Sequence, residues 1–326
     1  MNYVDFLDNA KPNPSLFGGK GSNLINLINF GVNTPQGFIV NTNSYRQFLK
    51  TSHLNEKLLQ IISTDYTPND IMGISTRIKE LFLRVQIPQG IVDEIKSAYI
   101  NLVKKIGKKT SFSVRSSANI EDSKSFSFAG QAESYLNIKT FKDIVIYVKN
   151  CWISLYSPQA LLYFLQMKKR NEEISLIDLE MAVIIQKMIN SQTSGVLFTV
   201  NVLNNEKNEM LINSTWGLGE LITNNLVIPD MIILDKKQFR LIKIIIGKKE
   251  KMSVPNPEGS STILLDTKPE LKEKLSLNND QLFQLYNLGL NLETIFNYPQ
   301  DIEWAIENDI LYPLQSRPIT TLRLIE

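Results

Sequence analysis

The sequence is poor in the residues that build disulfide frameworks and metal clusters. Its 326 residues include one cysteine, Cys151, and one histidine, His53. A single cysteine excludes an internal disulfide and any zinc site made of several cysteines, and it fits a protein of a reducing compartment. Cys151 lies in the apolar helical stretch VKNCWISLY, where a buried packing role is expected.

Charge of one sign and long apolar runs are also lacking. The net charge is only +2, which is too small to predict a nucleic-acid partner. The N-terminal stretch MNYVDFLDNAKPNP has no apolar core typical of a signal peptide. The apolar stretch LIKIIIGKK falls well short of the ~18 residues that a membrane-spanning helix needs. With 43% hydrophobic and 21% charged residues, we expect a folded cytoplasmic protein with no membrane or nucleic-acid partner.

The periodicity of apolar residues predicts an α+β chain in two lobes. Helical patterns dominate up to residue 106, and strands flank a polar loop within 111–138. The C-terminal part alternates β-branched strands with turns and closes on a hairpin at 301–317. We therefore expect an N-terminal lobe over 1–178 and a C-terminal lobe over 179–326.

The stretch FGGKGSNL contains the first candidate site. Glycines before a helix let backbone N–H groups approach an anion, and Lys20 adds a full positive charge. The stretch lacks the spacing of a P-loop. From this segment alone, a phosphate site and a tight turn with a solvated lysine both remain open.

A second candidate lies in SVRSSANIEDSKSFSFAGQ. We expect Arg115 to end an apolar strand, so that its guanidinium extends from rigid backbone. This planar group can bind two phosphate oxygens in bidentate fashion. Gly130 removes a side chain where the chain returns to the next strand. The alternative is a structural turn in which Arg115 pairs with Glu121 or Asp122.

Two glycines precede Glu220 in NSTWGLGELITNN, which predicts a bent loop. The Glu220 carboxylate could bind a ribose or a metal, or it could cap the helix that follows. The sequence favours neither interpretation.

The terminal hairpin DIEWAIENDILYPLQSR allows cross-strand pairs to be counted. A three-residue turn at 308–310, a common length, sets Glu303 opposite Gln315. Counting outward sets Asp301 opposite Arg317. Opposed side chains have Cβ atoms about 5 Å apart, so a carboxylate and an amide oxygen can share one Mg²⁺. A turn of two or four residues would shift this register, and Arg317 could also simply pair with Asp301.

These stretches, together with VIIQKMI and SGVLFT, resemble the motifs of a known enzyme family. In order and spacing, the motifs GGKGSNL, VRSSANIEDSKSFSFAGQAESYLN, VIIQKMI…SGVLFT, WGLGELI…PD and DIEWAI…LQSRPIT resemble the ATP-binding domain of one enzyme family. It is the family of phosphoenolpyruvate synthase, pyruvate phosphate dikinase and rifampin phosphotransferase. The resemblance covers nearly the whole chain and implies an ATP-grasp fold, with antiparallel or mixed sheets in two lobes that enclose a nucleotide cleft.

The resemblance implies catalytic roles at three basic residues. Lys20, Arg115 and Arg317 would contact the triphosphate and stabilise the group in transfer. Gly130 and Ser134 would line the nucleotide cleft.

Further roles follow from the remaining motifs. Gln186 would lie near the adenine, while Glu303 and Gln315 would bind Mg²⁺. Glu220 and Met188 are additional candidates for nucleotide contacts.

Some positions depart from the family's pattern. Ser134 stands where threonine is common, which keeps the hydroxyl. The loop tip reads SSANIEDSK where SSATAEDLP is usual, and Val200-Asn201-Val202 follows LFT where a polar pair is expected. Asn225 stands where glycine is expected, and asparagine is the side chain that best tolerates a left-handed backbone.

Enzymes of this family pass a phosphoryl group to a histidine on a swivelling domain. The histidine of this sequence, His53, lies in KTSHLNEK, outside any phosphohistidine motif, so a surface position near a helix start is expected. The resemblance therefore implies an ATP-binding domain or subunit that presents the β-phosphoryl group of ATP to a histidine elsewhere, giving AMP and phosphate. The alternative is a nucleotide-binding regulatory module without catalysis, and the final acceptor stays open.

Overall fold

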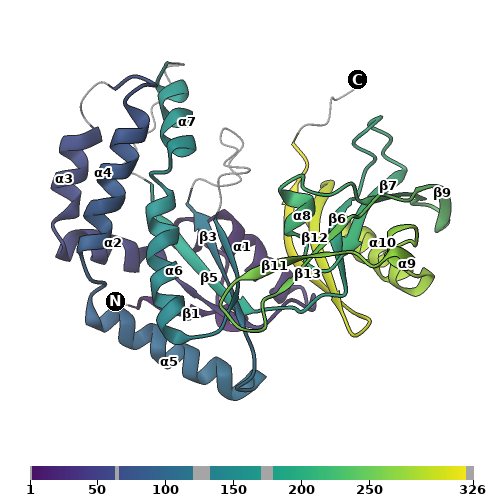
Figure 1. Ribbon diagram of the computed structural model, residues 1–326, viewed down its shortest axis with the longest axis horizontal. Helices are drawn as coiled ribbons and strands as arrows, with labels where there is room; N and C mark the ends of the chain where they lie inside the picture. The colour runs from purple at the N-terminus through teal and green to yellow at the C-terminus, as the bar shows by residue number, and fades with distance from the viewer. Residues whose placement is uncertain (1, 63–65, 120–132, 170–178, 321–326) are drawn as a thin grey trace. The chain divides into compact units, whose positions relative to one another are not determined.

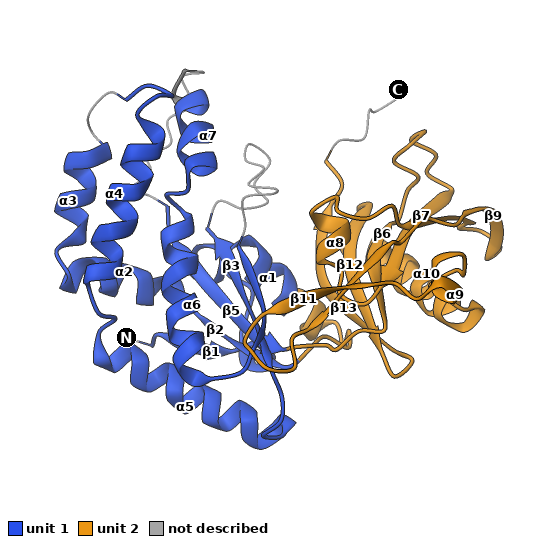
Figure 2. Ribbon diagram, viewed as in Figure 1, with its two compact units in different colours: residues 1–25, 36–187 blue, residues 26–35, 188–326 orange. Residues whose placement is uncertain are grey.

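The chain forms two compact units, which are described separately (Figures 1 and 2). A computed structural model describes residues 2–62, 66–119, 133–169 and 179–320. Unit 1 comprises Met1–Ile25 and Gln36–Lys187, and unit 2 comprises Asn26–Pro35 and Met188–Glu326. The predicted lobe boundary near residue 178 lies outside the described residues, and the change of unit comes at Lys187 and Met188.

Unit 1 is built on an antiparallel sheet in the order β1-β2-β5-β3-β4. Its strands are β1 (Val4–Phe6), β2 (Gly37–Val40), β3 (Phe112–Ala118), β4 (Ser134–Ile138) and β5 (Met181–Lys187). Strand β1 was not predicted, because three residues are too few to show an alternating pattern.

Helices cover both faces of this sheet (Figure 1): the helix that contains Gly21 packs against Ile39 on one face, and the others pack in the core on the opposite face. After the short 3₁₀ turn η1 (Leu7–Asn9), they are α1 (Pro14–Asn29), α2 (Thr42–Thr51), α3 (Leu54–Ile62), α4 (Ile71–Arg84), α5 (Gln89–Ile106), α6 (Phe141–Ser154) and α7 (Pro158–Lys169). The predicted helical patterns are thus confirmed. Asn41 and Thr140 begin α2 and α6 by accepting backbone N–H groups of Asn43 and Asp143.

The core of unit 1 is aromatic. Phe48 stacks on Trp152 with ring centroids 5.0 Å apart, and Phe82 packs on Phe48 at 5.5 Å. Cys151 is fully buried beside them, and burial raises the pKa of its thiol well above the ordinary value. The predicted packing role of this cysteine is confirmed, since a thiol that stays protonated is a poor nucleophile.

Unit 2 contains a six-stranded antiparallel sheet in the order β13-β12-β6-β7-β8-β9. These strands are β6 (Thr193–Phe198), β7 (Glu209–Trp216), β8 (Asp230–Asp235), β9 (Arg240–Ile245), β12 (Gln300–Glu307) and β13 (Ile310–Pro318). The unit also contains α8 (Glu220–Thr223), α9 (Pro269–Lys272), α10 (Asn279–Phe296) and a ribbon of β10 (Lys251–Pro255) with β11 (Thr262–Asp266).

Helix α10 covers one face of the large sheet. Asn278 and Gln281 form a capping box at its start, and Gly289 lets it approach Leu197 and Met210 closely. Strand pairing puts Ile302 beside Leu197, so alternate residues of β12 turn away from this helix. The opposite face of β12 and β13 is therefore left for polar side chains.

No helix in the described ranges combines the length and the apolar composition needed to span a bilayer.

Candidate functional site

One face of the unit 1 sheet carries polar side chains beside the buried apolar residues Ile39 and Ile184. Val114 belongs to the buried core, and side chains alternate along a strand, so Ser113 and Arg115 lie on the opposite face. The register aligns Arg115 with Ser134 on β4 and aligns Ser113 with Gln186 on β5. Three residues predicted to bind nucleotide therefore share one face of one sheet.

Arg115 lies in the middle of a strand. The sequence predicted that it ends the strand, but β3 continues to Ala118 because Ser116 and Ser117 pair with β5. Local propensity disfavours serine here, and the paired neighbour overrides it. The guanidinium is consequently mounted on backbone that is held on both sides, by β4 and by β5.

The glycine stretch lies inside α1, where the helix is broken at Gly18 (φ 71°, ψ 174°). A Cβ atom at Gly18 would lie 2.2 Å from Ser117 Oγ and 2.3 Å from the Ser117 carbonyl oxygen. Past the break, Gly21 N–H donates to Ser117 Oγ at 3.0 Å, and that hydroxyl donates to the Phe17 carbonyl at 2.8 Å. The start of the regular helix is thereby fixed against β3.

Lys20 is buried, with 8% of its surface exposed. Its ammonium lies 3.5 Å from the carbonyl oxygen of Ser116, next to Arg115 in the chain. The alternative of a solvated lysine in a tight turn is therefore wrong. A buried cation beside the start of a helix is chemically suited to bind an anion.

Gln186 is almost fully buried, at 2% exposed. Gly37 lies opposite it on β2, and a Cβ atom there would come within 2.8 Å of Gln186 Cγ. Gly37 therefore leaves room for the glutamine side chain. Its predicted place near an adenine stays a prediction.

Gly130, Glu121 and Asp122 lie outside the described residues. The chain that precedes them is fixed at Asn119. Its N–H donates to the Glu180 carbonyl at 3.0 Å, and its side-chain oxygen accepts from Glu180 N–H at 3.1 Å.

The terminal hairpin has a two-residue turn, not the predicted three. Glu307 pairs with Ile310, and Asn308 and Asp309 both have positive φ, as a type I′ turn requires. A β-bulge between Glu303 and Trp304 offsets the missing turn residue, because it adds one residue to β13. As a result, Glu303 still pairs with Gln315.

Outward from this pair, Asp301 faces Arg317, as predicted. Arg317 Nε and Nη2 each lie 2.8 Å from Asp301 Oδ2. The pairing of Arg317 with Asp301 that the sequence left open is therefore present, and the Asp301 side chain is only 12% exposed. Burial raises the pKa of Asp301 above its usual value, against the lowering effect of Arg317, and the nearby Glu303 carboxylate also raises it.

The oxygens of Glu303 and Gln315 suit a hard cation. Both side chains are on the face of β12 and β13 that α10 leaves uncovered, and Gln315 is 6% exposed. In the described part of the chain no group of three His, Cys, Asp or Glu side chains could hold a metal. Magnesium needs fewer protein ligands than that, because water and phosphate oxygens fill its other positions.

Glu220 begins α8 and accepts a hydrogen bond from the Ser253 hydroxyl. The N-cap of α8 is Gly219, so Glu220 does not occupy the capping position that the sequence left open. Gly217, at φ 76°, bridges the backbone of Ser253, and a Cβ atom there would lie 2.2 Å from the Ser253 carbonyl oxygen. The predicted bent loop is therefore present, and it contacts β10 through Ser253.

Two further expectations concern single residues. Asn225 has φ 55°, which confirms the left-handed backbone expected at a position where glycine was expected. Met188 is buried, at 8% exposed, and directly follows β5. His53 is exposed in the turn before α3, as predicted.

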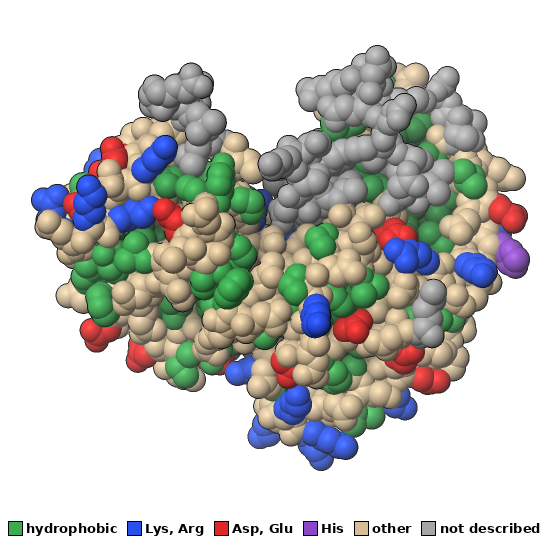
Figure 3. All heavy atoms as spheres, turned by 180° about the vertical axis from the view of Figure 1, so that it is seen from behind, with side chains coloured by type: hydrophobic (Ala, Val, Ile, Leu, Met, Phe, Trp, Pro, Cys, Tyr) green, Lys and Arg blue, Asp and Glu red, His purple; other side chains and the backbone are tan. Residues whose placement is uncertain are grey.

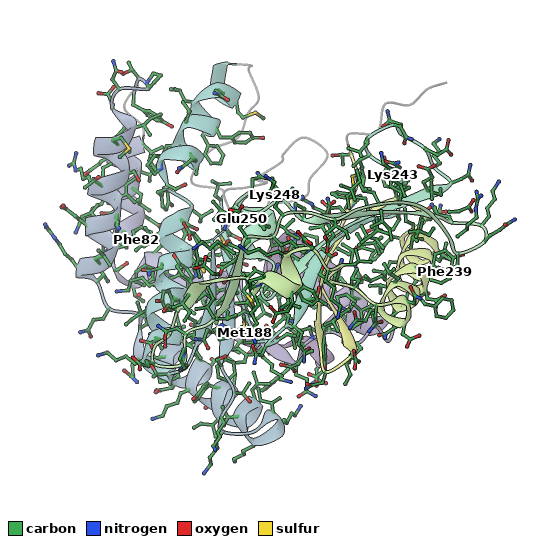
Figure 4. The ribbon with its side chains drawn as sticks, turned by 45° about the vertical axis from the view of Figure 1, so that its right-hand side comes forward. Phe82, Met188, Phe239, Lys243, Lys248 and Glu250 are labelled. Atoms are coloured by element: carbon green, nitrogen blue, oxygen red, sulfur yellow. The ribbon has the colours of Figure 1, made fainter. Side chains whose placement is uncertain are left out.

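Asp230 and Lys249 form a fully buried ion pair that was not predicted. Asp230 also accepts from Gly247 N–H at 2.9 Å and from Ser276 N–H at 2.8 Å. Lys248 and Glu250, which flank the buried lysine, lie together in Figure 4 and line a cavity of about 390 Å³. One signal for this pair was available, because Asp230 is the last residue of the motif WGLGELI…PD. Its partner Lys249 lies in a lysine-rich stretch with no distinguishing pattern.

Comparison with known proteins finds a family and several relatives. Residues 14–324 match the family described as pyruvate phosphate dikinase, AMP/ATP-binding domain. The chain is 35% identical over 99% of its length to a probable phosphoenolpyruvate synthase of Methanocaldococcus jannaschii, of which it covers 27%. It is 34% identical over 98% of its length to the phosphoenolpyruvate synthase of Pyrococcus furiosus, covering 44% of that protein.

A rifampicin phosphotransferase of Bacillus cereus is also similar, at 33% identity over 98% of the chain and 36% of the relative. The chain thus spans less than half the length of each of these relatives. The family match covers nearly every residue of the chain, including both units and the terminal hairpin. The chain therefore belongs to the AMP/ATP-binding domain family of pyruvate phosphate dikinase.

Proposed function

We propose that this chain is the MgATP-binding part of a dikinase-type phosphotransferase, with units 1 and 2 as the lobes of an ATP-grasp domain. It presents the β-phosphoryl group of ATP to a histidine on another domain or protein. The histidine nitrogen bonds to the β-phosphorus, AMP departs with the bridging oxygen, and water releases the γ-phosphoryl group as phosphate.

The observation that carries this proposal is the register of β12 and β13. It aligns Glu303 with Gln315 and Asp301 with Arg317 on one face of the hairpin. A carboxylate and an amide oxygen next to a guanidinium match the two demands of a metal–triphosphate ligand. A bound Mg²⁺ would neutralise charge on the phosphate oxygens and fix their geometry.

The residues of unit 1 supply the remaining positive charge. Lys20 and Arg115 bind phosphate oxygens and stabilise the charge that shifts during transfer, and Ser134 lies opposite Arg115 on the same face. The side-chain amide of Gln186 provides hydrogen-bonding groups for the adenine base. Catalysis of this kind is mostly positioning and electrostatic stabilisation, so rigid strands suit it.

A labelling experiment tests the reaction. The protein is incubated with a histidine-domain protein from the same source and with ATP labelled at the β- or the γ-phosphorus. We expect label on the histidine protein from β-labelled ATP only, together with AMP. Transfer of the γ-label with formation of ADP would place the chain in another class of kinase.

Replacing Arg115 with alanine should weaken both MgATP binding and transfer. Losing a hydrogen bond to a charged group costs about 1.5–3 kcal/mol, which corresponds to roughly a ten- to hundredfold loss. Calorimetric titration with MgATP and the labelling assay measure the two effects. Arg115→Lys should recover only part of the loss, because lysine keeps the charge but not the planar fork. Arg84→Ala, which removes an exposed arginine of α4, is the control, and equal values for all variants would refute the assignment.

Replacing Glu303 with glutamine should raise the Mg²⁺ concentration needed for half-maximal transfer. The expected change is about tenfold or more, since a carboxylate ligand becomes a neutral amide. The measurement is a Mg²⁺ titration at fixed ATP concentration. Glu258→Gln removes one charge from an exposed loop of the same unit and should leave the titration unchanged. An identical shift in both variants would mean that only net charge matters.

The second candidate is a nucleotide-binding regulatory module. It is favoured by one observation: the chain spans 27% to 44% of three similar enzymes, so it need not complete a reaction by itself. In that case MgATP raises the thermal stability of the protein, and no AMP forms with any histidine protein. AMP formation that Arg115→Ala abolishes rejects this second candidate.

A further inference from the structure

Strand β9 is an open edge of the unit 2 sheet. It pairs on one side with β8 and is the last strand in the order, at the edge opposite β13 (Figure 1). All six of its residues are exposed. In the described part of the chain, no backbone hydrogen bond is made from its outer side.

This edge is unusually apolar. Five consecutive or neighbouring side chains have between 38% and 48% of their surface exposed: Leu241, Ile242, Ile244, Ile245 and Ile246. Hydrophobic side chains lie beside lysine and arginine side chains on the outer end of this unit in Figure 3. An exposed apolar edge strand invites another strand to pair with it unless charge prevents this.

The charge around β9 has one sign. No acidic residue occurs between Asp235 and Glu250, whereas that segment contains Lys236, Lys237, Arg240, Lys243, Lys248 and Lys249. Lys236, Arg240 and Lys249 are paired with Glu293, Asp235 and Asp230, respectively. Lys243, labelled in Figure 4, lies in the middle of the strand and has no acidic partner among the described residues.

We propose that β9 binds an extended segment of another polypeptide, rich in alternating apolar and acidic residues, as an additional strand of the sheet. The binding chemistry follows from the open backbone edge and the positive charge together. A second copy of this chain is disfavoured, since pairing two β9 strands brings like charges together. A lipid surface is disfavoured because it cannot pair with the backbone groups of the edge.

The register specifies what the added strand must carry. Lys243 and Ile245 align with Ile233 and Met231, on the face away from α10. Leu241 aligns with Leu234 and Ile244 with Ile232, on the α10 face. The added strand therefore needs a carboxylate beside Lys243 on one face and apolar side chains beside Leu241 and Ile244 on the other.

A peptide titration tests the proposal without reference to ATP. The probe is a fluorescent, end-blocked decapeptide in which valine and glutamate alternate, and binding is followed by fluorescence anisotropy. We expect saturable binding, with slower amide hydrogen exchange at residues 240–246. A valine–lysine decapeptide should not bind. The valine–glutamate peptide with alternate amides N-methylated should bind at least about fivefold more weakly, because it cannot pair along the edge.

Charge reversal supplies the matched variants. Lys243→Glu should weaken binding of the valine–glutamate peptide at least about fivefold and allow the valine–lysine peptide to bind. Lys57→Glu makes the same change on the exposed face of α3 and should alter neither affinity.

Three results overturn the proposal. The first is equal binding of the N-methylated peptide, which would mean attraction without strand pairing. The second is a dimer in sedimentation that Lys243→Glu changes while no peptide binds. The third is binding to phosphatidylserine vesicles alone.

Discussion

Lys249→Met should be among the most destabilising single substitutions in unit 2. The ammonium and its partner Asp230 are both completely buried, so the variant leaves a buried carboxylate without its counter-ion. Removing one partner of a buried pair typically costs about 3–5 kcal/mol. The free energy of unfolding in urea measures the total effect. Hydrogen exchange should locate it in β8 and in the segment 246–253, which the pair fastens to the sheet.

A lysine two positions away offers the control. Lys251 pairs with Asp266 at 2.7 Å, but both side chains are exposed. Lys251→Met should therefore change the free energy of unfolding little, because water replaces the lost partner. If both variants unfold at the same urea concentration, the buried pair contributes no more than a surface pair. The double variant Asp230→Asn with Lys249→Met should recover part of the loss, since no unpaired charge remains.

Gly18→Ala should have the second large effect, and it should reach the candidate site. The backbone at φ 71° and ψ 174° is nearly closed to other residues and costs about 1–3 kcal/mol for alanine. The added Cβ atom would also lie 2.2 Å from Ser117 Oγ, where overpacking costs a further 1–3 kcal/mol or so. Because Ser117 fixes the start of the helix that carries Lys20, MgATP affinity should fall as well.

Gly107 separates the two contributions. It has a similar backbone, at φ 98° and ψ 152°, but no atom lies within 4 Å of the position of an added Cβ. Gly107→Ala should therefore show the backbone cost alone and leave MgATP affinity unchanged. Urea unfolding and calorimetric titration of both variants give the comparison. Equal losses of stability and affinity would mean that the contact with Ser117 is unimportant.

The hairpin shows how a correct prediction can rest on a wrong step. The sequence predicts that Glu303 faces Gln315, and it does, but through a two-residue turn and a bulge. Asn308 and Asp309 tolerate the positive φ of a tight turn, which the sequence could have indicated. The bulge has no comparable local signal, because it depends on how β13 follows its neighbour.

Other differences between prediction and structure also arise where a feature depends on contacts outside its own segment. The helical pattern up to residue 106, which includes α5, was predicted, since an amphipathic pattern is a property of the segment itself. The extension of β3 beyond Arg115 depends on β5, a partner distant in the sequence. The burial of Lys20 likewise depends on strand β3, so the sequence left a solvated side chain open where the fold makes a buried one.

The division of the chain between the units has a consequence for its synthesis. Residues 26–35 belong to unit 2, although unit 1 continues from residue 36 to residue 187. On the ribosome this short segment emerges early and must wait for its partners: Asn33 bonds to the Leu311 carbonyl, and Phe30 packs on Phe296. At about 5–20 residues per second, the delay is on the order of ten seconds or more. The apolar segment 26–35 of the nascent protein thus lacks its packing partners until the terminal hairpin is synthesised. During this period a chaperone can bind the segment.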